Sequence, residues 1–241
     1  MGNIEPYHLD RKQVISDMFH FTTGNKTGSI FPSREATAPI IYLNTFSDEG
    51  RKIYEAAQVA GCPPFTLVAV SNLDWNHDMV PWDGPPAFKN AEPCTGGADD
   101  YLRLLTEEII PAAERELAGV PSWRGIAGYS LAGLFALYAL YRTDLFSRVG
   151  SMSGSLWFPG MKEYLFSHEP KRRPDCIYFS LGDKESKTRN PVLRSVRQNT
   201  EEIQSFYQDK GIYTVFQLNP GNHYNHAAER TAAGIAWLLS R

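Results

Sequence analysis

The hydrophobic positions of this chain form short, dense runs separated by longer segments in which hydrophobic and polar residues mix. A short run of β-branched and other apolar residues predicts a strand that is buried on both faces of a sheet. Runs of this kind lie at residues 39–43, 65–71, 126–129, 148–153, 176–181 and 213–218. They predict the central strands of one buried sheet.

Segments with helical spacing lie between the predicted strands, at residues 51–60, 98–117, 131–140, 192–210 and near the C-terminus. Within the second of them, Pro111 predicts a kink or a new start of the helix, because proline has no backbone N–H to donate. Strands that alternate with helices in this way indicate an α/β fold, a mostly parallel, doubly wound sheet with helices on both faces. Because the composition does not shift along the chain, we expect residues 1–241 to form a single domain.

Three segments do not follow this alternation. Rough alternation of polar and apolar residues at 13–21 predicts half-buried strands at a sheet edge, and the polar residues 22–29 predict a loop. Residues 72–86 form a long segment rich in Trp and Pro. A loop of this length without regular structure is usually functional or disordered, and its aromatic residues favour a functional loop.

The strongest functional signal follows the strand predicted at 126–129. There Gly128-Tyr129-Ser130-Leu131-Ala132-Gly133 joins a strand directly to an apolar helix, which predicts a tight turn with Ser130 at its apex. Such a turn requires small residues on both sides of the serine, and Gly128 and Ala132 meet that requirement, although Ala132 stands where a glycine is usual. The serine hydroxyl would be an exposed nucleophile, and the N–H of Leu131 at the helix N-terminus would stabilise an oxyanion.

A serine nucleophile needs a base, and the loop after the last predicted strand offers two histidines. His223 directly follows the turn Pro220-Gly221-Asn222, whereas His226 precedes the C-terminal helix. We favour His223 because the turn would fix its position, and His226 stays the alternative. The pair could also bind a metal ion, but no third ligand lies nearby in the sequence, so we expect no metal site and no cofactor.

An acid that orients the histidine is predicted in the loop after the strand at 176–181, since function gathers at the carboxyl ends of parallel strands. Glu185 and Asp183 both lie there. The spacing Gly182-x-x-Glu185 favours Glu185, and Asp183 stays open. The chain order of serine, acid and histidine is one that a doubly wound architecture of this kind uses.

Composition narrows the class of partner. The net charge of −3 and the pI near 6.1 favour neither nucleic acid nor an anionic membrane surface. No signal peptide or membrane-spanning stretch is evident, so we expect a cytoplasmic protein. The cysteines, Cys62, Cys94 and Cys176, are odd in number and unclustered, which predicts reduced thiols rather than disulfides or a metal site.

Taken together, these motifs make the chain resemble the putative-esterase branch of the α/β-hydrolase superfamily, which includes enterochelin esterases, S-formylglutathione hydrolases and feruloyl esterases. The resemblance runs from about Pro39 to the C-terminus. Six segments carry it: Pro39-Ile40-Ile41-Tyr42-Leu43, Asp78-Met79-Val80-Pro81, Glu107-Glu108-Ile109-Ile110-Pro111, the turn at Ser130, Ser153-Gly154-Ser155-Leu156-Trp157 and Gly221-Asn222-His223.

The resemblance implies an α/β-hydrolase fold in which Ser130 is the nucleophile, His223 the base and the Leu131 N–H one oxyanion donor. It places the second donor after the strand at 39–43, where we assign the Phe46 N–H. Relatives often have a glycine in that loop, but this chain has Asn44-Thr45. Some enterochelin-esterase relatives work with a serine–histidine pair alone, so the acid could be absent.

The expected activity is that of a serine carboxylesterase. Trp157 and Trp75, with Trp82, are predicted to line an aromatic substrate pocket edged by Asp74 and Asp78. A chain of this length has no room for a large lid domain, which disfavours a lipase, and it has no basic cluster that would hold a polyanionic substrate. We therefore expect a small or medium polar ester, such as a siderophore ester or an acylated sugar. A thioesterase or acyltransferase with the same residues, or an inactive hydrolase-fold binding protein, remains an alternative, and homo-oligomer formation is left open.

Overall fold

The computed structural model describes residues 18–86 and 91–241, and its centre is one eight-stranded sheet. The strands follow the order β1-β2-β4-β3-β7-β8-β9-β10. Their bounds are Phe19–Thr23 (β1), Lys26–Phe31 (β2), Ile40–Asn44 (β3), Thr66–Ser71 (β4), Arg124–Tyr129 (β7), Arg148–Met152 (β8), Cys176–Gly182 (β9) and Tyr213–Asn219 (β10). From β4 to β10 all neighbouring strands are parallel, and β1 and β2 add an antiparallel edge. The prediction of a mostly parallel sheet is confirmed.

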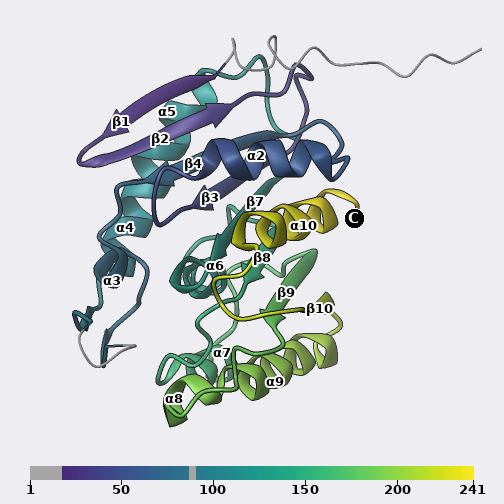
Figure 1. Ribbon diagram of the computed structural model, residues 1–241. Helices are drawn as coiled ribbons and strands as arrows, with labels where there is room; N and C mark the ends of the chain where they lie inside the picture. Colours follow the sequence, from purple (N-terminus) through teal and green to yellow (C-terminus); the bar gives the residue numbers. More distant parts are fainter. Residues whose placement is uncertain (1–17, 87–90) are drawn as a thin grey trace, which may run out of the picture.

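Helices cover both faces of this sheet, as Figure 1 shows. Their bounds are Gly50–Val59 (α2), Trp75–Asp78 (α3), Ala98–Leu104 (α4), Ile110–Arg115 (α5), Leu131–Arg142 (α6), Met161–Ser167 (α7), Pro191–Arg194 (α8), Val196–Asp209 (α9) and Ala227–Leu239 (α10). Alternate residues of a strand point to opposite faces, so Ile41 and Leu43 of β3 pack with α2 and α10, whereas Ile40 and Tyr42 pack with α6. The core therefore has two halves, one on each face.

The parallel strands end at the same edge of the sheet. Asn44 of β3 is aligned with Gly128 of β7, and Gly182 of β9 is aligned with Asn219 of β10. The loops that follow these strands consequently meet at one edge, which is where the sequence places its candidate residues.

Two predictions about local structure are wrong. Residues 22–29 were predicted as a loop, but they turn at Gly24 and enter β2, so that β1 and β2 form a hairpin. The segment 72–86 was predicted without regular structure, but it contains α3 and the two-residue strand β5 (Asp83–Gly84), which pairs with β6 (Cys94–Thr95). β2 is also held by the distant strand β4, where Thr27 is aligned with Ser71.

Pro111 interrupts the helix that was predicted at 98–117, as expected. A π-helical turn, Leu105–Ile109, lies between α4 and α5, and the N–H of Ile110 donates to the carbonyl of Leu105. Proline cannot donate the next bond of an α-helix, and the wider turn accommodates this loss. The three segments still form one continuous stretch from residue 98 to residue 115.

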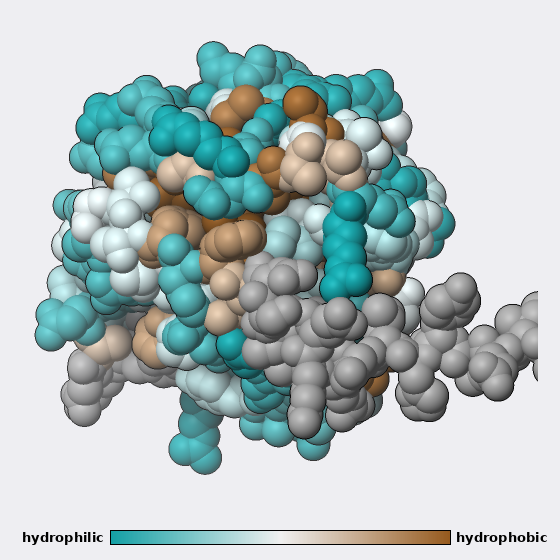
Figure 2. Space-filling model, turned by 90° about the horizontal axis from the view of Figure 1, so that it is seen from above, coloured by the Kyte–Doolittle hydropathy of each residue, from teal (hydrophilic) through white to brown (hydrophobic). Residues whose placement is uncertain are grey.

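The outer surface is mainly hydrophilic on the side where Figure 1 shows β1 and β2, but hydrophobic residues gather near the centre of that face (Figure 2). Phe19 of the edge strand β1 is one exposed apolar residue, with 41% of its surface accessible. In the described part of the chain, no helix combines the length and the apolar character that crossing a membrane requires.

Candidate functional site

Ser130 lies at the apex of a tight turn between β7 and α6. Its backbone has φ 60° and ψ −126°, a region that residues with side chains rarely adopt and that costs free energy. Two bonds to the neighbouring strand and loop hold it there: the Ser130 N–H donates to the Met152 carbonyl at 3.1 Å, and the Ser130 carbonyl accepts from the Ser155 N–H at 3.0 Å. The surrounding structure therefore maintains the strained turn.

Close packing of backbones explains the small residues around Ser130. A Cβ atom at Gly128 would lie only 2.4 Å from the carbonyl carbon of Ala132, and one at Gly133 would lie 3.0 Å from the Gly128 oxygen. Glycine is thus required at position 128, and it is strongly favoured at position 133. The methyl group of Ala132 fits because it faces Gly128, which has no side chain.

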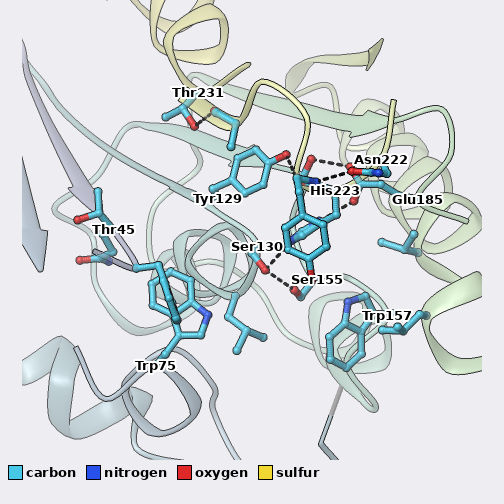
Figure 3. A pocket seen from close by; sticks show the side chains of 18 of the residues that line it. Thr45, Trp75, Tyr129, Ser130, Ser155, Trp157, Glu185, Asn222, His223 and Thr231 are labelled. Carbon is cyan, nitrogen blue, oxygen red and sulfur yellow. Dashed lines mark hydrogen bonds and ion pairs between the residues drawn. The ribbon is translucent and has the colours of Figure 1, made fainter. Parts of the chain in front are cut away.

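A chain of hydrogen bonds connects Ser130 with His223 and Glu185, each from a different loop (Figure 3). His223 Nε2 lies 3.0 Å from Ser130 Oγ, and His223 Nδ1 lies 2.8 Å from Glu185 Oε2. An ionised carboxylate only accepts, so Nδ1 carries the proton and donates to Glu185. Nε2 is left as an acceptor that faces the serine hydroxyl, which is the arrangement a general base requires.

Glu185 is almost fully buried, yet it is held in its ionised form. Burial alone would raise its pKa, but the hydrogen bond and charge of His223 and the bonds from Arg230 and Gly182 outweigh this effect and lower the pKa to about 2. Oε1 accepts from the Gly182 N–H at 2.6 Å and from Arg230 at 2.9 Å. It also accepts from Ser153 Oγ at 2.7 Å. Glu185 is therefore ionised at neutral pH.

The loop that carries His223 is fixed from several sides. Tyr129 donates its hydroxyl to the His223 carbonyl at 2.7 Å, and Arg230 donates to the Asn222 carbonyl at 3.1 Å. Asp183 accepts from the Gly221 N–H at 2.7 Å, so it holds this loop and does not reach the imidazole. The position of His223 is thus set by residues of β7, α10 and the loop after β9.

The second histidine and the second acid lie outside this chain of bonds. His226 is exposed and has a left-handed backbone (φ 55°) immediately before α10. The structure therefore brings Glu185 and His223 together with Ser130, and it places Asp183 and His226 elsewhere.

Two backbone N–H groups near Ser130 make no hydrogen bond within the described residues. One belongs to Leu131, the first residue of α6, and the other to Phe46, in the loop after β3. The N–H of Thr45 is not free, because it donates to the Val70 carbonyl at 2.9 Å. Leu131 and Phe46 both line the cavity that contains Ser130.

Ser155 is a further polar neighbour of Ser130. Its Oγ lies 3.3 Å from Ser130 Oγ, and its side chain is buried. Because the single proton of the Ser130 hydroxyl goes to His223, Ser155 has to be the donor in this pair. Ser130 Oγ thus donates one hydrogen bond and accepts another.

The cavity around Ser130 has a volume of about 790 Å³, which is enough for a ligand of drug size. Trp75, Trp157 and Phe46, all expected at the substrate site, line it. Phe46 packs edge-on against Trp75, with 5.3 Å between the ring centres. Trp75 and Trp157, which the sequence predicted at the substrate pocket, thus line the cavity that contains Ser130, and so does Phe46, whose N–H was assigned as an oxyanion donor.

Trp82 and Asp78, which were expected at this pocket, lie elsewhere. Trp82 donates its indole N–H to the Pro159 carbonyl at 2.9 Å and packs against Phe158. Asp78 is buried in an ion pair with Lys26 of β2 and also accepts from the Asp74 N–H. Both residues anchor the segment after β4 rather than bind in the cavity.

Cysteine and metal chemistry have little support at this site. Cys94 lines the cavity, but burial raises the pKa of its thiol, which disfavours the reactive thiolate. Cys62, Cys94 and Cys176 form no disulfide. Across residues 18–86 and 91–241, no group of three or more Asp, Glu, His or Cys side chains has an arrangement that could hold a metal ion.

Sequence reasoning missed Arg230, Ser153 and the role of Ser155. Arg230 is almost fully buried in α10, where it contacts Glu185 and Ser153. A buried arginine in a helix cannot be distinguished from an exposed one by its sequence position alone. Ser153 and Ser155 belong to the motif Ser153-Gly154-Ser155-Leu156-Trp157, but the residue types of this motif do not show which atoms the two serines contact.

Comparison with known proteins identifies the family of the chain. The family model described as "Putative esterase" matches residues 43–227. The protein YbbA of Bacillus subtilis, which is uncharacterised, is 22% identical over 216 residues, covering 84% of this chain and 86% of YbbA.

Solved structures share the fold at low sequence identity. The siderophore hydrolase EstA from Aspergillus nidulans is 17% identical with a TM-score of 0.72, covering 99% of both chains. An IroE-like serine hydrolase from Shewanella oneidensis is also 17% identical with a TM-score of 0.73, covering 92% of this chain and 79% of that one. These structures confirm the α/β-hydrolase fold, and the family match extends over more than half of the sequence. The chain therefore belongs to the putative esterase family.

Proposed function

We propose that the protein is a serine carboxylesterase that hydrolyses esters of small or medium polar substrates through an acyl-enzyme intermediate. Membership of an esterase family supports ester hydrolysis in general. The observation that carries the finer proposal is the chain of hydrogen bonds from Glu185 through His223 to Ser130, beside two unpaired N–H groups in one cavity. This combination supplies a nucleophile, a base with its orienting acid, and donors for an oxyanion.

The first half of the reaction acylates the serine. Ser130 Oγ attacks the ester carbonyl carbon while its proton passes to His223 Nε2, which the negative charge of Glu185 stabilises as an imidazolium. The N–H groups of Leu131 and Phe46 donate to the oxyanion that forms. His223 then gives its proton to the leaving alcohol oxygen, the ester bond breaks, and the acyl group stays on Ser130.

The second half of the reaction releases the acid. A water molecule gives a proton to His223 Nε2 and attacks the acyl carbon, again forming an oxyanion at the same donors. The bond to Ser130 Oγ then breaks, and His223 returns the proton to this oxygen. Ser130 ends in its starting state, so no cofactor is consumed.

The substrate class is inferred from the cavity and from structural neighbours. The mouth of the cavity is aromatic, with Phe46 and Tyr224 largely exposed and Trp75 and Trp157 partly buried. The neighbour EstA is described as a siderophore hydrolase, and a further structural neighbour, IroE, is described as an enterobactin and salmochelin hydrolase. Both facts support a polar, uncharged or weakly charged ester such as a siderophore ester or an acylated sugar.

Rapid mixing with p-nitrophenyl acetate tests this proposal. An acyl-enzyme mechanism predicts a burst of p-nitrophenol close to one equivalent of protein, followed by steady turnover. Intact-mass measurement during turnover should detect one acetyl group on the protein. A burst without turnover would favour the acyltransferase alternative, and a thioester hydrolysed much faster than a matched oxygen ester would favour a thioesterase. No burst and no turnover would favour an inactive binding protein.

We also propose a cytoplasmic location and a small-molecule ester, rather than a nucleic acid or a membrane, as the partner. The low net charge of −3 supports the second part of this statement.

A further inference from the structure

The strand β10 forms one edge of the sheet, and its outer side has no partner strand within the described residues. Figure 1 shows β10 at the end of the sheet opposite β1. The carbonyl of Asn219 accepts from the Asp183 N–H at 2.7 Å, on the side of β9. The backbone groups of alternate residues point to opposite sides of a strand, so those of Thr214, Phe216 and Leu218 point to the open edge.

This edge has none of the features that usually prevent an edge strand from pairing. Natural edge strands are protected by short length, by charged side chains, by proline or by a bulge. β10 has seven residues, and none of them is charged, a proline or a glycine. All seven continue the register with β9 without a bulge. An uncharged strand of this length is a template for one further strand.

An exposed aromatic cluster lies at the beginning of β10. Tyr213 is 55% exposed, and its ring stacks on that of Trp237 from α10, with 5.5 Å between the ring centres. The guanidinium group of Arg241 lies over both rings, 5.3 Å from the centre of Tyr213 and 5.0 Å from that of Trp237. This end of the edge therefore presents two aromatic rings and a positive charge.

A hollow of about 520 Å³ lies at the other end of the same strand. Asn219 and Pro220 line it, together with Glu229 and Ala233 of α10. Glu229 and Ala233 are exposed, and Glu229 forms no ion pair within the described residues. Glu229, Ala233 and Trp237 are four residues apart, so they form one stripe of α10 that runs beside β10 from the hollow to the aromatic cluster.

The open edge can pair with a second copy of itself in the antiparallel direction. When the two-fold axis passes through Phe216, this residue lies opposite Phe216 of the second copy, and Thr214 lies opposite Leu218. All three residues then exchange backbone hydrogen bonds with the second strand. In the single chain the Leu218 carbonyl accepts from Gln217 Nε2 at 3.2 Å, and the second strand replaces this side chain.

The same register joins the two ends of the edge. Tyr213 of one copy lies opposite Asn219 of the other, so the aromatic cluster of each copy faces the hollow of its partner. Arg241 comes near Glu229 in the same arrangement, and their charges are opposite. A pair of this kind at the rim contributes little stability but sets the orientation of the two copies.

We propose that two copies of this chain pair through β10 and form a symmetric dimer with one continuous sheet. A second copy fits this edge better than a different protein does, because the aromatic cluster and the hollow that receives it lie at opposite ends of the same strand. A two-fold axis brings these ends together twice, which is the self-complementarity that a symmetric interface requires. The dimer is independent of the proposed function.

Sedimentation velocity at several protein concentrations tests this proposal. For the wild type we expect a species with twice the chain mass of 27.1 kDa. Gln217→Lys places a charge in the paired edge twice in each dimer, so the dissociation constant should rise at least about a hundredfold. Gln58→Lys is the matched control, because it makes the same change at an exposed position of α2, and its dissociation constant should equal that of the wild type.

Two cysteine variants, Val215→Cys and Gln217→Cys, test the register. In the proposed pairing position 215 lies opposite position 217 of the second copy, within reach of a disulfide, whereas position 215 does not reach position 215. Under mild oxidation a mixture of the two variants should form a linked dimer, and each variant alone, like the wild type, should form little.

Circular dichroism checks that each variant is folded, and the disulfide test decides the proposal if Gln217→Lys does not fold. A wild type that is monomeric at every concentration overturns the proposal, and so does a dimer that a folded Gln217→Lys leaves intact. A mixture of the cysteine variants without the linked dimer overturns it as well. The proposed ester hydrolysis stands in each of these cases.

Discussion

Replacement of Glu185 by Gln should change how stability depends on pH. Burial of the Glu185 carboxyl raises its pKa, but the hydrogen bonds from His223, Arg230 and Gly182 and the charge of His223 lower it more. The net result is a pKa of about 2, compared with the ordinary value of 4.5. At about 1.4 kcal/mol for each pH unit, this difference corresponds to about 3 kcal/mol of folding free energy. The side chain of Glu185 is only 5% exposed, so solvent screening reduces this value little.

The sign of the effect follows from the direction of the pKa change. A carboxyl with a lowered pKa in the folded state contributes its full stability above about pH 4.5 and loses it as the pH falls toward 2. By pH 3, about 2 kcal/mol of the contribution should be gone. Glu185→Gln cannot ionise, so it lacks this component. The bond from the buried Arg230 is one of the causes of the lowered pKa, so its loss is part of this contribution and is not added to it.

Urea unfolding monitored by tryptophan fluorescence at pH 7, 5, 4 and 3 measures the difference. At pH 7, Glu185→Gln should be less stable than the wild type by about 3 kcal/mol. The gap should narrow by about 2 kcal/mol at pH 3. Glu229→Gln, the same change at an exposed position of α10, should follow the wild type at every pH. If the free energies of unfolding of Glu185→Gln and the wild type differ by the same amount at every pH, the argument that this carboxylate is stabilised by its buried partners is refuted.

The remaining predictions concern activity on p-nitrophenyl esters. His223→Ala should lower kcat/KM at least about a thousandfold, whereas His226→Ala should keep a substantial fraction, and the reverse result would reassign the base. Glu185→Gln should lower kcat more than Asp183→Asn, because only Glu185 contacts the imidazole; equal effects would indicate that the acid is dispensable. Ser155→Ala removes one neutral hydrogen bond to Ser130 and should lower kcat about tenfold or less, so a loss as large as that of His223→Ala would show a direct catalytic role for Ser155.

The central part of the fold could be predicted because its signals are local. Runs such as Ile40 to Asn44 contain their own evidence of burial, since every residue of β3 is buried and nearly all are apolar. The tight turn at Ser130 could also be predicted, because the small residues that it requires lie within three positions of the serine. His223 and Glu185 followed from the rule that loops at the carboxyl ends of parallel strands meet.

The features that escaped prediction depend on partners distant in the sequence. The sequence of β2 resembles a polar loop because the strand begins with Lys26 and Thr27. In the structure Lys26 is buried, and it forms an ion pair with Asp78, which lies 52 positions away. Trp82 does not line the cavity, because its indole N–H donates to the Pro159 carbonyl, 77 positions away. Arg230 contacts Glu185 across 45 positions. A single sequence carries no signal for such pairs.

The central claim, that Ser130 is a nucleophile activated by its neighbours, has a direct test. The wild type and Ser130→Ala are each treated with a fluorophosphonate probe, analysed by intact mass and peptide mapping, and assayed with p-nitrophenyl acetate. The account predicts one adduct on Ser130 of the wild type, none on Ser130→Ala, an unchanged circular dichroism spectrum, and a loss of kcat/KM of at least about a thousandfold. An adduct at another residue of the wild type, or activity of Ser130→Ala above about a thousandth of the wild-type value, would contradict it.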